Sequence, residues 1–203
     1  MSDIKLGYGK TSVKLTFDDT RFSVLANDSL QETPLSDPQI GAAFDSPISC
    51  APLDEIVSPE DSVLLVVSDA TRATGSTQIV NLLVRRLIQH GILPGQVAII
   101  FATGIHRPVT AQEQLELLTS FITQRIRTLT HDAYQPRDMT SLGVTARGIK
   151  VDVNRALKDF SRVILTGGIG YHYFAGFTGG RKSICPGLAS AETIEATYLG
   201  SLA

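Results

Sequence analysis

Three largely apolar runs constrain the fold of this chain more than any other feature of its sequence. They are Val63–Val67, Val97–Phe101 and Arg162–Thr166. A strand with one face in water alternates polar and apolar residues, whereas a strand that is covered on both faces does not. Stretches long enough for helices separate the runs. The sequence therefore predicts an α/β fold, with a mostly parallel sheet flanked by helices and a small β-rich N-terminal segment.

Helical patterns occupy the first two gaps between these runs. Apolar residues recur at helical spacing over Ser76–His90, and Gly91 is well placed to end that helix. Thr110 and Glu113 form a capping-box pattern in front of a second helix, which is expected to continue through Ile122. Two weaker runs are expected to form further strands, Arg127–His131 and Gly148–Val153.

The first 60 residues have a different character from the expected α/β core over residues 61–203. Short strands are predicted at Lys5–Gly9, Ser12–Phe17 and Phe22–Ala26, between Gly, Lys and Asp turn residues. Five prolines then fall within Ser29–Pro59, which predicts a meandering connection with a short helix. We expect no catalytic residue from this region.

Composition excludes several classes of partner. Apolar residues make up 43% of the 203 residues and the formal net charge is -2, so no basic field is available to attract nucleic acid or anionic lipid. Cys50 and Cys185 are isolated, which argues against a disulfide framework or a structural zinc site. The first residues lack the apolar core of a secretory signal, and no apolar run reaches the roughly 18 residues of a membrane span. We expect a cytoplasmic protein.

A polar segment follows each apolar run directly. Asp69 and Arg72 follow the first run, His106 follows the second, and His172 follows the third. Loops at the carboxyl ends of parallel strands converge, so these side chains share one crevice if the three strands are neighbours. Each residue also has a purely structural interpretation, as a helix cap, a solvated arginine, a loop histidine or a packed histidine. Their joint position at three strand ends favours the functional interpretation.

The segment Gly176–Ser183 has the composition of a phosphate-binding loop. Its glycines allow backbone amides to approach an anion, and Arg181 and Lys182 add positive charge. The segment also approximates the P-loop pattern G-x-x-x-x-G-K-[ST] of ATPases. However, Arg181 stands where the final glycine is needed, and Pro186–Gly187 would interrupt the helix that must follow. The ATPase interpretation is therefore disfavoured.

Together these segments resemble the lactate racemase family. The resemblance is carried by Ser68–Arg72, Ala102–Pro108 and, above all, His172–Ser183 with Pro186–Gly187. It is clearest over Ser62–Ser190 and covers the chain as an N-terminal half. Family members also have a C-terminal domain, so the resemblance implies that domain as a partner and predicts that this half alone is inactive.

The resemblance implies a cofactor, the nickel-pincer nucleotide. This is a pyridinium mononucleotide whose sulfur groups hold nickel and which is tethered to a lysine. Lys182 matches that lysine, and the loop residues around it, Thr178, Gly179, Gly180 and Arg181, are expected to bind the cofactor.

The resemblance also implies roles for the residues at the strand ends. His106 and His172 match two acid–base histidines, Arg72 matches an arginine that binds the substrate, and Asp69 matches an active-site acid beside it. Histidine titrates near working pH, and arginine can hold a carboxylate with two parallel bonds. The implied reaction is racemisation of a small 2-hydroxy acid by hydride transfer to and from the cofactor.

One position departs from the family pattern. The family supplies nickel with a histidine sixteen residues after the cofactor lysine, and that position is Tyr198 here. A phenol is a poor substitute for imidazole at nickel, so the metal ligand remains unassigned. A non-catalytic nucleotide- or phosphate-binding module is the alternative function.

Overall fold

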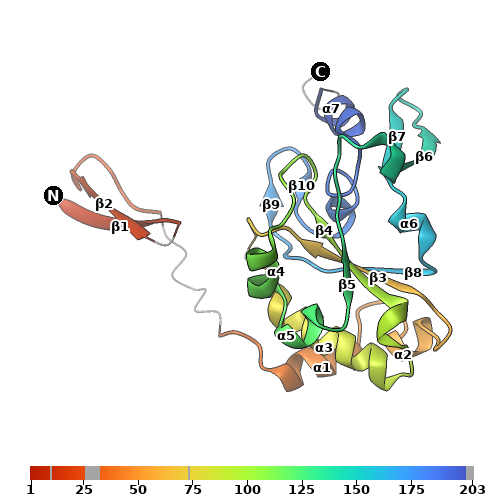
Figure 1. Ribbon diagram of the computed structural model, residues 1–203. Helices are drawn as coiled ribbons and strands as arrows, with labels where there is room; N and C mark the ends of the chain where they lie inside the picture. Colours follow the sequence, from red (N-terminus) through yellow and green to blue (C-terminus); the bar gives the residue numbers. More distant parts are fainter. Residues whose placement is uncertain (10, 26–32, 73, 200–203) are drawn as a thin grey trace. The chain divides into compact units, whose positions relative to one another are not determined.

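The computed structural model describes residues 1–9, 11–25, 33–72 and 74–199, which fall into two compact units, Met1–Leu35 and Ser36–Ala203. In the first unit, strands β1 (Ser2–Tyr8) and β2 (Thr11–Phe17) pair antiparallel as expected (Figure 1). The third expected strand, Phe22–Ala26, is not formed over residues 22–25, and Ala26 lies outside the described residues. The carbonyl of Asp18 accepts hydrogen bonds from the amides of Arg21 and Phe22, so the chain turns there and gains no strand partner.

The second unit is built on a parallel four-stranded sheet, as the three apolar runs predict. Its order is β5 (Arg127–Leu129), β4 (Val97–Ala102), β3 (Val63–Ser68) and β8 (Arg162–Leu165). In the register of the sheet, Val63 is opposite Val97 on one side and Arg162 on the other. The strands that precede the three polar segments are therefore neighbours, with β3 at the centre.

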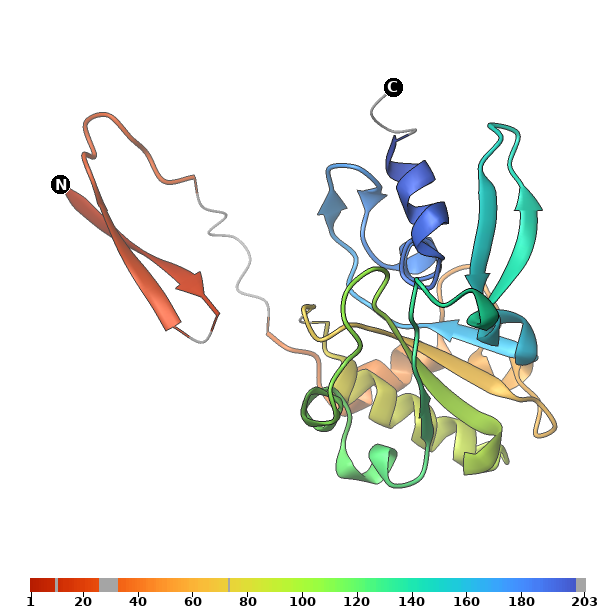
Figure 2. The same cartoon turned by 45° about the horizontal axis from the view of Figure 1, so that its top comes forward.

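Both faces of the sheet are covered, which explains why its central strands do not alternate. On one face Leu65 and Val67 pack against helix α3 (Ser76–Gln89). On the other face Leu64 and Val66 pack with Leu188 and with helix α6 (Ala156–Asp159). Figure 2 shows α3 running along one side of the sheet and the C-terminal elements lying on the other.

The helices on the α3 face confirm most of the expected boundaries. Gly91 adopts φ 105° directly after α3, and Thr110 caps α4 (Ala111–Leu117) in a capping box with Glu113. The expected continuation through Ile122 is wrong, because Leu118 and Thr119 are extended and a separate helix α5 (Ser120–Thr123) follows. Helices α1 (Asp37–Asp45) and α2 (Leu53–Ile56) belong to this second unit, where Phe44 and Leu53 pack against its core.

Several short elements complete the second unit. The expected strand near Gly148–Val153 is β7 (Lys150–Asn154), which pairs antiparallel with β6 (Met139–Val144) rather than joining the parallel sheet. A two-stranded ribbon, β9 (Tyr171–His172) and β10 (Gly176–Phe177), follows β8. The remaining elements are the 3-10 turns η1 (Pro94–Gln96), η2 (Pro136–Asp138) and η3 (Gly180–Ser183) and the helix α7 (Ala191–Leu199). Among the described residues, no helix combines the length and apolar composition needed to cross a lipid bilayer.

Candidate active site at the sheet edge

A cavity of about 650 Å³ lies at the carboxyl ends of β3, β4 and β8. The loops after these strands supply most of its walls, as parallel sheets predict. Seven of the nine residues predicted for the site line it: Asp69, Arg72, His106, His172, Thr178, Gly179 and Lys182. Gly180 and Arg181 do not line it, and both are exposed on η3.

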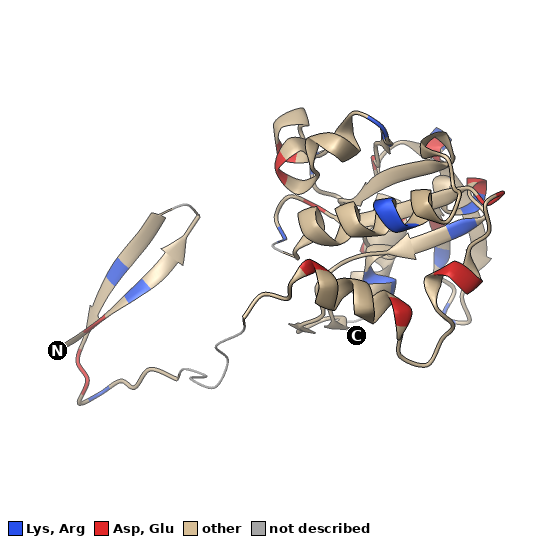
Figure 3. Cartoon of the chain, turned by 90° about the horizontal axis from the view of Figure 1, so that it is seen from below, with Lys and Arg blue, Asp and Glu red and all other residues tan. Residues whose placement is uncertain are grey.

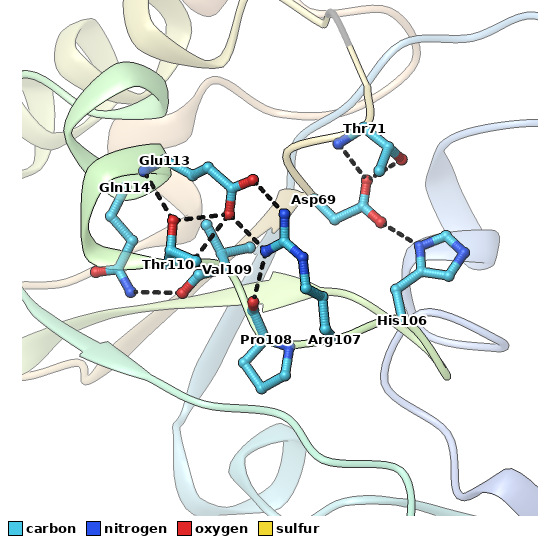
Figure 4. A network of polar contacts seen from close by, with 9 residues as sticks. All are labelled: Asp69, Thr71, His106, Arg107, Pro108, Val109, Thr110, Glu113 and Gln114. Carbon is cyan, nitrogen blue, oxygen red and sulfur yellow. Dashed lines mark hydrogen bonds and ion pairs between the residues drawn. The ribbon is translucent and has the colours of Figure 1, made fainter.

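Asp69 and His106 form a hydrogen-bonded pair across two neighbouring strand ends (Figure 4). Asp69 is buried, and its Oδ2 lies 2.6 Å from Nδ1 of His106. The other carboxylate oxygen accepts hydrogen bonds from the Thr71 amide (3.1 Å) and hydroxyl (2.6 Å). A carboxylate only accepts, so Nδ1 of His106 carries a proton in this arrangement. In the neutral ring Nε2 is then left with a free lone pair.

The loop that carries His106 is anchored on the side away from Asp69. Figure 4 shows the next residue, Arg107, directed towards Glu113 at the start of α4. Its guanidinium donates to both carboxylate oxygens of Glu113, at 2.8 and 2.6 Å. This pairing and the bonds from Thr110 lower the pKa of Glu113 to about 2. Arg107 thus connects the loop that carries His106 to the start of α4.

His172 on β9 differs from His106 in that its Nδ1 accepts hydrogen bonds instead of donating one. Its Nδ1 accepts hydrogen bonds from the backbone amides of Phe174 (3.2 Å) and Ala175 (3.1 Å), so the proton of the neutral ring lies on Nε2. The ring stacks on Tyr173, with centroids 5.0 Å apart. Partial burial and the positive charges of Lys182 and Arg72 lower the pKa of His172, which favours the neutral ring.

Lys182 and Arg72 bring an amine and a guanidinium to the same cavity. Burial and the nearby charge of Arg72 lower the pKa of Lys182, which favours an uncharged amine. Among the described residues, neither cation is paired with a carboxylate. An uncharged amine is a nucleophile, and an unpaired guanidinium in a cavity is a site for an anion.

The glycine-rich loop packs against the loop after β8. Thr178 donates its hydroxyl hydrogen to the carbonyl of Gly168 (2.9 Å) and accepts from the amide of Gly170 (2.8 Å), so its side chain joins two loops. Gly179 adopts φ 70°, and a Cβ there would lie 2.8 Å from the carbonyl oxygen of Gly168. After the single turn of η3, no helix begins until Ala191, which differs from a P-loop.

The cavity also contains residues that the sequence did not identify as ligand-binding. Thr103 and Ser183 are buried and line its wall. Tyr198 on α7, at the position where the resemblance predicts a metal-binding histidine, lines the cavity and meets the ring of Phe174 edge-on at 5.6 Å. In the part of the chain that the structure describes, no cluster of three His, Cys, Asp or Glu side chains is arranged to hold a metal ion.

The fold and these motifs agree with known proteins. The lactate racemase of Lactiplantibacillus plantarum is 30% identical over 204 residues, covering 98% of this chain and 48% of that protein. The lactate racemase of Thermoanaerobacterium thermosaccharolyticum is 27% identical over 201 residues, covering 98% of this chain and 47% of that protein. This chain thus spans about half the length of these relatives.

Solved structures show the same relationship. The lactate racemase apoprotein from Thermoanaerobacterium thermosaccharolyticum matches with a TM-score of 0.80 at 27% identity, over 96% of this chain and 46% of that chain. A crystal structure of a protein from Thermotoga maritima matches with a TM-score of 0.69 at 25% identity, over 83% of this chain and 42% of that chain. The sequence profile of the lactate racemase N-terminal domain matches residues 8–202, so the chain belongs to this family, as its strand-end motifs predict.

Proposed function

We propose that this chain carries the acid–base and cofactor-binding half of a racemase or epimerase that acts on a small 2-hydroxy acid. The observation that supports this most strongly is the opposite hydrogen bonding of Nδ1 in the two cavity histidines, to a carboxylate in His106 and to backbone amides in His172. His106 presents the lone pair of Nε2 because Asp69 holds its Nδ1 proton, whereas His172 presents Nε2–H because backbone amides occupy its Nδ1. One ring is prepared to accept a proton and the other to donate a hydrogen bond.

These two states match what a hydroxy acid requires when its C2 hydrogen leaves as hydride. The hydroxyl proton passes to Nε2 of His106 as the C–O bond becomes a carbonyl, and Nε2–H of His172 stabilises the oxygen of the planar keto acid. Arg72 binds the carboxylate and keeps the substrate oriented. As hydride returns to the opposite face of C2, the oxygen takes a proton from Nε2 of His172, and in the other direction that Nε2 accepts the hydroxyl proton. Both steps require Nδ1 of His172 to be protonated, so the ring gives up its two hydrogen bonds of 3.1–3.2 Å from backbone amides.

The residues of the cavity fit a lysine-tethered nucleotide. Lys182 supplies an amine with a lowered pKa for the tether, and Gly179 keeps the adjoining loop free of side-chain bulk. The nickel-pincer nucleotide, when bound, provides the electron-poor centre that accepts the substrate hydride and returns it. Nickel has no assigned protein ligand in this chain, since Tyr198 stands at the expected position.

The test uses full-length protein, including the half that this chain does not span, loaded with the cofactor. Single enantiomers of 2-hydroxy acids that carry deuterium at C2 are incubated with it and analysed by chiral chromatography and mass spectrometry. We expect inverted product that retains deuterium, because the hydrogen travels as hydride. Lys182→Ala abolishes the reaction, whereas the exposed control Lys158→Ala preserves it. Unchanged configuration across a broad panel, or loss of deuterium to water, contradicts the proposal.

The position of Tyr198 favours one alternative, a non-catalytic nucleotide-binding module. This alternative predicts that the full-length protein binds a pyridine mononucleotide but inverts none of the hydroxy acids. Inversion of any of them eliminates the alternative.

A further inference from the structure

Thr103 has a buried hydroxyl whose presence the fold does not explain. The residue directly follows Ala102, the last residue of β4, is 4% exposed, and lines the cavity. Its backbone is fully used, because its amide bonds to the carbonyl of Phe101 (3.0 Å) and its carbonyl accepts from His106 (2.9 Å). Within the described part of the chain, Oγ1 has no hydrogen-bond partner. A buried polar atom without a partner is costly, so it points to a ligand.

The surroundings hold Thr103 in place. The amide of Gly104 donates to the carbonyl of Gly187 (2.8 Å), which fixes the chain after β4 against the loop after η3. A Cβ on Gly187 would lie 2.8 Å from Cβ of Ala102, so the two segments pack closely on either side of the threonine. Thr103 therefore belongs to a closely packed wall of the cavity, as a binding residue must.

The charges of the cavity indicate what this hydroxyl meets. Arg72 and Lys182 line the same cavity, and neither has a carboxylate partner among the described residues. Asp69 also lines the cavity, but its two carboxylate oxygens are directed to Thr71 and His106 rather than to Arg72 or Lys182. A cavity that offers a guanidinium, an amine and an unused hydroxyl, none of them paired with a carboxylate among the described residues, is suited to an anionic oxygen, which can accept hydrogen bonds from such groups.

We propose that Thr103 is a ligand-binding residue of this cavity, whose hydroxyl donates a hydrogen bond to an anionic oxygen of the bound nucleotide or substrate. This inference rests on the proposed function, which brings both a mononucleotide phosphate and a hydroxy-acid carboxylate to the cavity. The shared chemistry is an oxyanion that accepts from the threonine hydroxyl, and the test separates the two sources.

The test compares three variants of the full chain by calorimetry with three probes: nicotinate mononucleotide, inorganic phosphate and lactate. Thr103→Val keeps the shape and removes the hydroxyl, and we expect affinity for the relevant probes to fall about 10-fold. Thr103→Ser restores the hydroxyl and most of the affinity. The control is Thr166→Val, at a buried threonine outside this cavity whose hydroxyl donates to the carbonyl of Val66 (3.0 Å).

Thermal unfolding supplies a second readout, because the loss of a packing role would lower the melting temperature and the loss of a ligand-binding role would not. The melting temperature of Thr103→Val should not fall, because no hydrogen bond of the ligand-free protein is lost, whereas Thr166→Val should melt lower with unchanged affinity. Weaker binding of the mononucleotide and of phosphate identifies the phosphate as the partner, and weaker binding of lactate alone identifies the carboxylate.

Two results overturn the inference while leaving the proposed function intact. They are equal affinity of Thr103→Val and wild type for every probe, and a melting temperature of Thr103→Val as low as that of Thr166→Val. Absence of binding of all three probes to the wild-type chain overturns the inference together with the nucleotide-binding part of the proposed function.

Discussion

The orientation of His106 depends on a single buried carboxylate. In Asp69→Asn, Oδ1 can keep its bonds to Thr71, so the amide NH₂ faces Nδ1 of His106. An amide donor at that position forces the ring proton onto Nε2, which removes the proton acceptor. We expect kcat for racemisation by the loaded full-length protein to fall by about 10²–10⁴-fold with little change in KM.

Nitrogen NMR of the histidine ring gives a readout of the same substitution that does not depend on turnover. The spectrum of His106 should change from the tautomer protonated at Nδ1 to the one protonated at Nε2. The control Asp132→Asn alters an exposed aspartate whose carboxylate accepts a hydrogen bond from the amide of Tyr134 (2.9 Å), and it should leave both kcat and the spectrum unchanged. An unaltered His106 tautomer in Asp69→Asn would show that the carboxylate does not set it.

Lys182 and Lys150 should differ in reactivity because their surroundings shift the pKa values of the two amines in opposite directions. Burial and Arg72 lower the pKa of Lys182, whereas the hydrogen bond to Asp152 raises the pKa of Lys150. Near pH 8 more of Lys182 is therefore in the reactive, uncharged form. Competitive labelling with limiting acetic anhydride, followed by peptide mapping, should modify Lys182 first.

The substitution Arg72→Gln tests the electrostatic part of this explanation. Removing the neighbouring positive charge raises the pKa of Lys182, so its labelling near pH 8 should slow while that of Lys150 stays constant. Identical labelling rates of Lys182 in the wild type and in Arg72→Gln would show that burial alone lowers the pKa of Lys182.

At the scale of elements, β4 and the loop after η3 pack closely at Gly187. A Cβ on Gly187 would overlap the carbonyl oxygen of Ser183 and lie 2.8 Å from Cβ of Ala102. Neither atom is the end of a flexible side chain, so Gly187→Ala must move backbone. We expect it to lower the free energy of unfolding by about 1–3 kcal/mol in urea titrations and to weaken mononucleotide binding.

Gly95→Ala is the matched control, because nothing lies within 4 Å of a Cβ there and the residue is in η1, away from the cavity. Its stability and its affinity for the mononucleotide should equal those of the wild type. If Gly187→Ala also left stability and mononucleotide affinity unchanged, the close contact between β4 and the η3 loop would not be required for the site.

The sequence predicts the central elements of the fold well, and the peripheral ones poorly, for a physical reason. β3 and β4 are covered on both faces, so burial produces the continuous apolar runs that identify them. β6 and β9 bury little, and β9 has only two residues, so neither produces a pattern that could be recognised. The sequence does not reveal the break between α4 and α5, because Leu118 and Ile122 keep helical spacing although the backbone at Leu118 and Thr119 is extended.

The candidate site was predictable to the extent that it follows from strand order. Residues after β3, β4 and β8 converge because those strands are neighbours, and this needs only the apolar runs and the rule for parallel sheets. Thr103 could not be identified in this way, because a threonine before a glycine is common in turns. Its importance depends on the approach of Gly187, a contact between residues far apart in the chain.

At the scale of the whole molecule, acidic and basic residues occur on many different elements (Figure 3). Individual pairs connect elements. Arg86 on α3 binds Asp54 on α2 at 2.8 Å and also contacts Asp45 on α1. Asp61 accepts from the side chains of Ser161 (2.7 Å) and Arg162 (3.0 Å), which joins the beginnings of β3 and β8. Stability should therefore depend on pH through a few such connections.

Asp61 allows this dependence to be predicted with its sign. The amide of Ser58, with Ser161 and Arg162, lowers the pKa of Asp61 from 3.8 to about 2 in the folded protein. The folded pKa lies below the unfolded one, so on acidification the unfolded chain binds a proton first. The contribution of Asp61 to the free energy of unfolding is therefore complete above about pH 5 and is lost as the pH falls towards 2. The urea midpoint should fall over this range. In Asp61→Asn the urea midpoint should be lower at pH 7 but should decrease less as the pH falls below 5. Asp132→Asn should keep the pH dependence of the wild type. An unchanged slope in Asp61→Asn would place the acid sensitivity elsewhere, with Glu113 as the next carboxylate to test, because its folded pKa is also about 2.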